Sequence, residues 1–180
     1  REQIADPENN PFPTHSGKIE IFSPDLYRLG RPEEIPAIPR HMPCPEGPED
    51  PLTQRYPLQL VGWHTRRRCH SIHDNNQWMD EVEAPALWIH PEDARARRIG
   101  QGDLVEVFND RGKVRIPALV TERIMRGVTA MSQGGWYRPD RQGTDTRGSI
   151  NVLTDGDHPS PLAKGNPQHT NLVEVQRAGN

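Results

Sequence analysis

The stretch Ala84–Val120, "APALWIHPEDARARRIGQGDLVEVFNDRGKVRIPALV", decides the fold of this chain. Its beginning, "ALWIH", is a short apolar run typical of a strand. Pro91 then opens "PEDARARR", which predicts a short helix with acids in its first turn and arginines in its last, as the helix dipole favours. "LVEVF" and "KVRIPALV" predict two strands joined by the turn "NDRG".

Further short apolar stretches outside this region also predict strands. They are "SGKIEIFS" (Ser16–Ser23), "YPLQLVGW" (Tyr56–Trp63), "GVTAMS" (Gly127–Ser132), "INVLT" (Ile150–Thr154) and "NLVEV" (Asn171–Val175). Many short strands with one or two short helices indicate a mainly β protein, a closed barrel or a sandwich.

The barrel is the arrangement we expect, with six or seven strands and the helix Pro91–Arg98 packed on its outside. Burial of each core side chain is worth roughly 1.5–3 kcal/mol. Much of the core should come from Ala86, Leu87, Ile89, Val105, Val107, Val114, Ile116 and Val120.

Composition excludes several classes of protein. The chain has 180 residues and a net charge of -3, which argues against a general nucleic-acid binder. No apolar run approaches the roughly 20 residues that span a bilayer, and the opening "REQIADPENN" lacks the apolar stretch of a signal peptide. We therefore expect a soluble chain, either cytosolic or cut from something larger. Cys44 and Cys69 form no CxxC pair, so neither a disulfide framework nor a metal cluster is expected.

Prolines suggest the domain boundaries. Eight of the 19 prolines lie between Pro32 and Pro57, a density that sustains neither a helix nor a central strand. We expect residues 1–30 to be the end of a preceding domain or a strand leading into the barrel. Residues 31–55 should be an extended linker, and residues 56–180 the compact domain.

The stretch "GWHTRRRCHSIHDN" (Gly62–Asn75) holds three arginines and three histidines between His64 and His73. The histidines could be zinc ligands. However, Pro51–His73 contains four arginines and no Asp or Glu, and this positive field disfavours a cation. A metal site is therefore the weakest interpretation, and none is predicted.

Two other interpretations of this stretch stay open. A run of charge is often a solvated face. It could also be an anion pocket, because an arginine fork binds two phosphate oxygens and Ser and His add neutral donors. If the segment is extended, His64, Arg66, Arg68 and His70 share one face, which suits a pyrophosphate.

Two loops carry further candidate groups. In "SQGGW" (Ser132–Trp136), Gly134 and Gly135 should let backbone N–H groups approach a ligand closely, and Trp136 should anchor the loop rather than stack on a base. In "SPLAKGNPQHTNLVEVQ" (Ser160–Gln176), the amides of Asn166 and Gln168 can complement a heterocycle edge such as that of guanine or pterin. Turn capping explains the same amides equally well.

Taken together, these segments resemble the dimethyl sulfoxide reductase family of molybdenum enzymes, in particular its membrane-associated type with iron-sulfur partners. The resemblance runs from Gly17 to Val175 and includes "SGKIEIFS", "PLQLVGWHTRRRCHS", "SQGGW" and "SPLAKGNPQHTNLVEV" in this order. The last motif is specific, whereas the strand motif around Gly102 and Asp103 is shared by many relatives. Cys69, Asp74 and Tyr137 depart from the family pattern, which leaves the fold intact and the substrate open.

The resemblance implies a double-psi β-barrel, of the aspartate-decarboxylase-like class, that binds molybdopterin guanine dinucleotide. The whole enzyme would carry two such dinucleotides around one molybdenum and reduce S-oxides or N-oxides, dimethyl sulfoxide above all, by oxygen-atom transfer. Combined with the chemistry above, it makes these the expected cofactor-binding residues: His64, Arg68, His70, Ser71, Gln133, Gly134, Gly135, Trp136, Asn166, Gln168, His169 and Thr170.

The resemblance also implies partners that are not in this sequence. The molybdenum ligand and the cluster cysteines belong to earlier domains of the catalytic subunit, so no catalytic residue is predicted here and the domain alone should be inactive. An iron-sulfur electron-transfer subunit and a membrane anchor subunit would complete the complex, at the periplasmic face of the cytoplasmic membrane. The alternatives are a β-barrel that binds an anion or a partner without a redox role, and a domain of a related oxyanion reductase such as selenate reductase.

Overall fold

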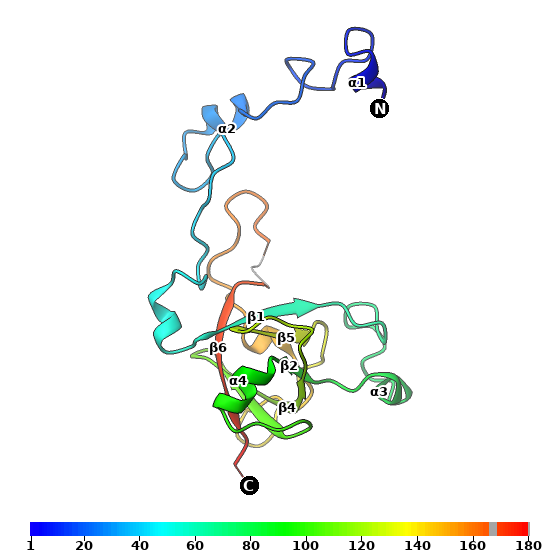
Figure 1. The fold of residues 1–180 in the computed structure, drawn as a ribbon, viewed down its shortest axis with the longest axis vertical. Helices are drawn as coiled ribbons and strands as arrows, with labels where there is room; N and C mark the ends of the chain where they lie inside the picture. Colours follow the sequence, from blue (N-terminus) through cyan, green and yellow to red (C-terminus); the bar gives the residue numbers. More distant parts are fainter. Residues whose placement is uncertain (166–168, 180) are drawn as a thin grey trace. The chain divides into compact units, whose positions relative to one another are not determined.

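The computed structural model describes residues 1–165 and 169–179, and divides the chain into two compact units, 1–42 and 43–180 (Figure 1). The first unit contains two short helices, α1 (Glu2–Ala5) and α2 (Pro24–Leu29). The strand predicted at Ser16–Ser23 was wrong, since this segment forms only turns and bends. Ile19 and Ile21 are 75% and 73% exposed, so their alternation has no sheet to pack against.

The second unit holds the sheet. In chain order its elements are η1 (Pro51–Gln54), β1 (Leu58–Trp63), α3 (Trp78–Val82), β2 (Leu87–Ile89), α4 (Pro91–Ala96), β3 (Leu104–Phe108), β4 (Lys113–Val120), β5 (Val128–Ser132), η2 (Ile150–Val152) and β6 (Asn171–Arg177). Residues 43–55 belong to this unit, and Glu46 among them is buried. The division of the chain at residues 30 and 55 stays a prediction.

The six strands close into a barrel in the order β1-β5-β2-β4-β3-β6. β1 pairs with β5 and β2 pairs with β4 in parallel, whereas the other neighbours are antiparallel. The mainly β, closed barrel of the double-psi class is therefore confirmed, with six strands. The prediction of a strand at Ile150–Thr154 was wrong: these residues begin with the 3₁₀ helix η2.

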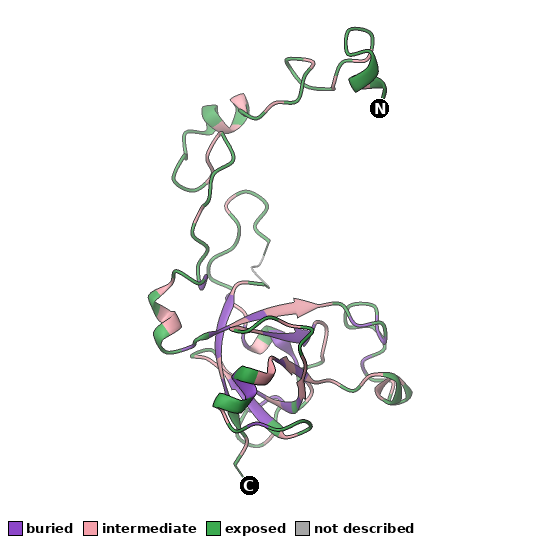
Figure 2. Ribbon diagram, viewed as in Figure 1, coloured by how far each residue is buried: buried purple, intermediate pink, exposed green. Residues whose placement is uncertain are grey.

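The core lies inside this barrel, where the strands are buried (Figure 2). Of the predicted core residues, six are buried: Leu87, Ile89, Val105, Val107, Val114 and Ile116. Ala86 and Val120 are only partly buried. Helix α4 begins at Pro91 as predicted, with His90 as its N-cap, and it ends at Ala96 rather than at Arg98.

The strand register determines which loops share an end of the barrel. Trp63 pairs with Ser132 at the last residues of the parallel strands β1 and β5, so the loops that follow both strands leave at one end. β6 is antiparallel to β1 and begins with Asn171 opposite Leu60. The segment before β6 therefore reaches this same end, which we call the loop end of the barrel.

Candidate functional site

The Arg/His stretch follows β1 and folds as a series of turns, so the condition under which His64, Arg66, Arg68 and His70 would share one face is not met. Cys69 pairs with Ile72 in an isolated bridge, and His70 and His73 have φ angles of 51° and 75°. His64 and His70 still come together, with ring centroids 5.1 Å apart, and both are exposed. Arg66 is exposed, whereas its neighbours Arg67 and Arg68 turn into the protein.

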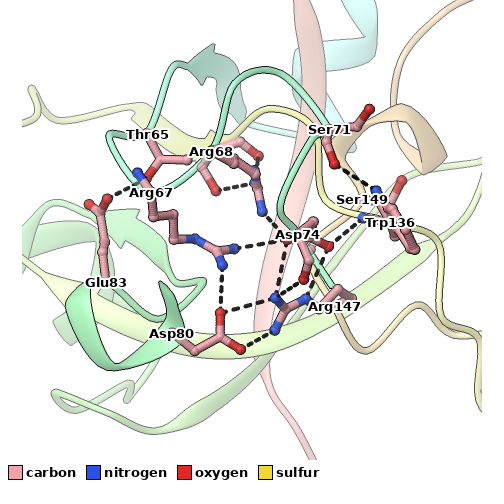
Figure 3. A network of polar contacts seen from close by, with 12 residues as sticks. Thr65, Arg67, Arg68, Ser71, Asp74, Asp80, Glu83, Trp136, Arg147 and Ser149 are labelled. Atoms are coloured by element: carbon pink, nitrogen blue, oxygen red, sulfur yellow. Dashed lines mark hydrogen bonds and ion pairs between the residues drawn. The ribbon is translucent and has the colours of Figure 1, made fainter. Parts of the chain in front are cut away.

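Asp74 receives these buried arginines (Figure 3). Its Oδ1 pairs with the guanidinium of Arg68 and lies 3.2 Å from Nη2 of Arg67. Its Oδ2 accepts the backbone N–H of Trp136 at 2.9 Å and Nε of Arg147 at 3.1 Å. The side chains of Arg67, Arg68 and Asp74 are each only 1% exposed.

Asp80, a partly exposed residue of α3, completes a network of Arg67, Arg68, Asp74, Asp80 and Arg147, which we call the Asp74 network. Its carboxylate binds Arg67 at 2.5 Å and Arg147 at 2.6 Å, so three guanidinium groups share two carboxylates. Burial raises the pKa of Asp74, but hydrogen bonds from Arg147 and the Trp136 N–H lower it more, leaving it below its usual value. The hydrogen bonds of Arg147 to Asp80 and then to Asp74 raise the pKa of Arg147, so its guanidinium stays charged.

Arg68 therefore uses its donors inside the protein. Besides Asp74, it donates from Nε to the Gln133 carbonyl at 2.8 Å and from Nη2 to the Ser132 hydroxyl at 2.9 Å. The pKa of Arg68 is lowered, mainly by burial and further by the positive charge of the neighbouring Arg67. Arg68 ties the loop after β1 to the loop after β5, and its contact with a phosphate stays a prediction.

The loop after β5 lies directly on the Arg/His stretch. Gly134 has a φ of +82°, and a Cβ there would lie 1.9 Å from the His70 carbonyl oxygen. At Gly135 a Cβ would lie 2.5 Å from the carbonyl oxygen of Gly148. Both glycines are thus required by contacts between backbone segments of the protein itself. The indole N–H of Trp136 donates to the Ser71 carbonyl at 2.8 Å, an anchoring contact for this loop.

The segment before β6 reaches the same place. Nδ1 of His169 accepts the Gly62 N–H at 3.2 Å, and the side chain of Gln133 packs on Gly62, within 2.7 Å of where a Cβ would be. Asn166 and Gln168, whose amides were predicted to bind a heterocycle, lie outside the described residues.

Two buried polar atoms at the loop end have no hydrogen-bond partner among the described residues. They are Nε1 of Trp63, at the end of β1, and Oγ1 of Thr170, which precedes β6. A buried donor without a partner costs about 1–3 kcal/mol. Such atoms are normally satisfied in folded proteins.

The structure thus brings together His64, Arg68, His70, Ser71, Gln133, Gly134, Gly135, Trp136, His169 and Thr170 at one end of the barrel. Sequence analysis missed Trp63, Asp74, Asp80 and Arg147. The stretch Pro51–His73 contains no acidic residue, but Asp74 follows it directly. Among residues 1–165 and 169–179, no group of three or more His, Cys, Asp or Glu side chains could hold a metal ion.

Comparisons with known proteins match residues 58–172 to the family described as "Molydopterin dinucleotide binding domain". "Dimethyl sulfoxide reductase DmsA" of Escherichia coli (strain K12) is 47% identical over 178 residues, which cover 96% of this chain and 22% of that protein. "Trimethylamine-N-oxide reductase" of Haemophilus influenzae is 38% identical over 180 residues, with the same coverage of 96% and 22%.

One solved structure has a similar fold. "Acetylene Hydratase from Pelobacter acetylenicus" matches with a TM-score of 0.72 and 18% identity, over 96% of this chain and 25% of that one. At this identity the likeness concerns the fold alone. Within the described residues every helix is too short and too polar to cross a membrane.

This chain spans about a fifth of the length of the curated relatives that it matches. The family match covers the barrel from the first residues of β1 to the first residues of β6, and with them all three loops of the loop end. The chain therefore belongs to the molybdopterin dinucleotide-binding domain family and is related to the dimethyl sulfoxide reductases.

Proposed function

We propose that this chain is the dinucleotide-binding domain of a molybdenum oxidoreductase that removes oxygen from S-oxides or N-oxides, dimethyl sulfoxide in the first place. The observation that carries the proposal is the convergence of three loops at the loop end, where Trp63 and Thr170 keep buried donors without partners among residues 1–165 and 169–179. The 47% identity to a dimethyl sulfoxide reductase supports the class of substrate.

The donor set of the loop end fits a dinucleotide with a pyrophosphate. The hydroxyls of Ser71 and Thr170 and the indole of Trp63 are neutral donors, and the exposed Arg66 adds a positive charge nearby. The Asp74 network holds the loops in place, so that they need little reordering on binding. Asn166 and Gln168 would then meet the edge of the guanine or the pterin.

The bound molybdenum cofactor would supply the centre at which oxygen is transferred. This chain binds and orients the cofactor and contributes no catalytic residue. We further propose that two dinucleotides surround the molybdenum, and that an iron-sulfur cluster lies in another domain of the catalytic subunit. An iron-sulfur subunit and a membrane anchor subunit, at the periplasmic face of the membrane, complete the proposal.

Substitution of Thr170 by Val tests the binding role, because Val keeps the shape and removes the hydroxyl. Without ligand, Thr170→Val should leave the melting temperature unchanged or raise it, since a buried unpaired hydroxyl destabilises the fold. In the longer polypeptide that we propose, it should reduce by about tenfold the guanosine monophosphate and molybdenum recovered per chain, which corresponds to about 1.4 kcal/mol.

Thr129→Val is the matched control. The Thr129 hydroxyl is buried and donates to the Trp88 carbonyl at 2.5 Å, so its loss should lower the melting temperature and leave cofactor content per folded chain unchanged. Full cofactor content in Thr170→Val would contradict a role of this hydroxyl. A wild-type polypeptide that retains neither guanosine monophosphate nor molybdenum would contradict the proposed function itself.

A further inference from the structure

The turn between β3 and β4 lies against the base of the segment 154–170, which we call the terminal loop. At Gly112 a Cβ would lie 2.5 Å from Cγ1 of Val152, so the turn packs closely on η2. The Asn109 side chain donates from Nδ2 to the carbonyls of Leu153 at 2.9 Å and of Leu172 at 3.2 Å. One amide group therefore joins the residue before the terminal loop to a residue just after it.

Arg111 and Glu46 make the same connection a second time. Arg111 donates to the Leu153 carbonyl from Nε at 3.0 Å and from Nη2 at 2.8 Å. Its guanidinium also binds the Glu46 carboxylate through both oxygens, at 2.8 Å for the pair Nη2–Oε2. Oε2 of Glu46 in turn accepts the Leu172 N–H at 2.7 Å. The chain of contacts again runs from Leu153 to Leu172.

The backbone of Leu172 needs these side chains. The pairing of β3 with β6 ends with Phe108 opposite Glu174, so β3 does not extend to Leu172. Glu46 takes the Leu172 N–H, and Asn109 takes its carbonyl. Glu46 does so with a φ of 55°, a left-handed conformation that is unfavourable for a residue other than Gly, Asn or Asp. Its side-chain contacts stabilise this conformation.

The start of the terminal loop also binds the first residue of β6, which directly follows this loop. The Asp155 N–H donates to Oδ1 of Asn171 at 3.1 Å, and Asn171 is fully buried. Both ends of the loop are thus fixed to one another and to the turn, a short distance from His169 and Thr170.

We propose that Glu46, Asn109 and Arg111 are positioning residues for the dinucleotide. They form a clasp that holds both ends of the terminal loop and so fixes where its binding residues lie at the loop end. The inference rests on the proposed function, because the clasp matters for binding only if this loop contacts the cofactor. None of the three residues need touch the ligand.

Hydrogen exchange separates this role from general stability. In Arg111→Ala, the amides of residues 155–165 and 169–172 should exchange about tenfold faster, while those of β4 and β5 keep their protection. The matched control is Arg97→Ala, which also removes a partly buried Arg–Glu pair, here with Glu174 at 2.6 Å, but does not contact the clasp. It should lower the melting temperature without faster exchange in the terminal loop.

Asn109→Asp is the second variant, in case Arg111→Ala fails to fold. It keeps the size of the side chain and replaces the donor by a carboxylate that faces two carbonyl oxygens. The amides of its terminal loop should also exchange faster, because the hydrogen bonds from residue 109 to Leu153 and Leu172 are lost. In the longer polypeptide, both variants should lose more than half of the guanosine monophosphate recovered per folded chain, and Arg97→Ala should retain it.

If the amides of the terminal loop exchanged at the wild-type rate in the folded variants, the claim that the clasp holds this loop would be overturned. Faster exchange with full guanosine monophosphate content would overturn its positioning role, while the proposed function would stand. A wild-type polypeptide without guanosine monophosphate would remove the proposed function, and with it the positioning role, whatever the exchange rates.

Discussion

The Asp74 carboxylate accepts hydrogen bonds from three arginines and from the Trp136 N–H, at a position that is almost fully buried. A buried ion pair contributes little net stability by itself, because desolvation offsets its attraction. Removing one partner is different, since the remaining charges stay buried without compensation. Loss of the Asp74 charge would leave the three arginine side chains buried with too little negative charge to compensate them.

We expect Asp74→Asn to lower the free energy of unfolding by about 3–5 kcal/mol, as for other broken buried pairs. Urea titration followed by Trp fluorescence measures this. Glu92→Gln is the control, because its pair with Arg126 is 53% and 73% exposed and should contribute less than about 1 kcal/mol. Equal effects of the two substitutions would show that the Asp74 network is solvated.

The position of Asp74 also explains a limit of sequence analysis. Arg147 lies 73 residues further along the chain, and no local pattern pairs it with Asp74. The arginine run itself could be read as an anion pocket because its counter-charges lie beyond Pro51–His73: Asp74 follows this stretch directly, and Asp80 lies in α3. Gly134, by contrast, could be predicted from the motif as a close backbone contact, although the neighbour is the His70 carbonyl.

Among the secondary-structure elements, β3, β4 and β6 share one ion cluster on the barrel wall. Glu106 accepts from Lys113, Arg115 and Gln176. Burial raises the pKa of Glu106, but the hydrogen bonds from Lys113, Arg115 and Gln176 outweigh it and lower the pKa from 4.5 to about 2. Cross-strand pairs of this kind stabilise the register of a sheet.

A folded-state pKa below the unfolded one stabilises the protein above the unfolded pKa, and this contribution is lost as the pH falls toward the folded value. The fall in the pKa of Glu106 corresponds to roughly 3 kcal/mol, and solvent around Lys113, 38% exposed, reduces this to about 2 kcal/mol. Glu106→Gln should therefore be about 2 kcal/mol less stable at pH 7. Urea unfolding of the wild type and of Glu106→Gln at pH 7 and at pH 2 checks this. A difference in stability between them that is as large at pH 2 as at pH 7 would contradict it.

The elements that sequence analysis predicted well include β3 and β4, strands that bury apolar residues in the barrel. The two wrong strands fail for physical reasons. Ser16–Ser23 has the alternation of a strand but no partner, and a lone strand is not stable. In Ile150–Thr154 the buried residues are Ile150 and Leu153, three positions apart, which is the spacing of a 3₁₀ turn and not the period of two.

On the scale of the whole molecule, the barrel has its own core and includes residues 43–55, among them Glu46. Deletion of residues 1–42 should therefore shift the melting temperature of the barrel by no more than about 2 °C. Deletion of residues 1–50 also removes Glu46 from Arg111 and Leu172, and should lower stability by about 2 kcal/mol. Calorimetry of the two truncated chains distinguishes these expectations, and equal melting temperatures would contradict them.

Strand order also has a consequence for how this barrel is made. β6 lies between β3 and β1 in the closed barrel. The first strand of the barrel to be synthesised therefore lacks one of its two neighbours until the last strand has been made. Until Asn171–Arg177 has left the ribosome, β1 and β3 each present an open edge to the cell, where unpaired edges invite association with other chains. Pairs so distant in sequence also form slowly. We therefore expect the barrel to close only after Asn171–Arg177 has been synthesised, so that its assembly, and the insertion of any cofactor into it, follow a period in which chaperones can act.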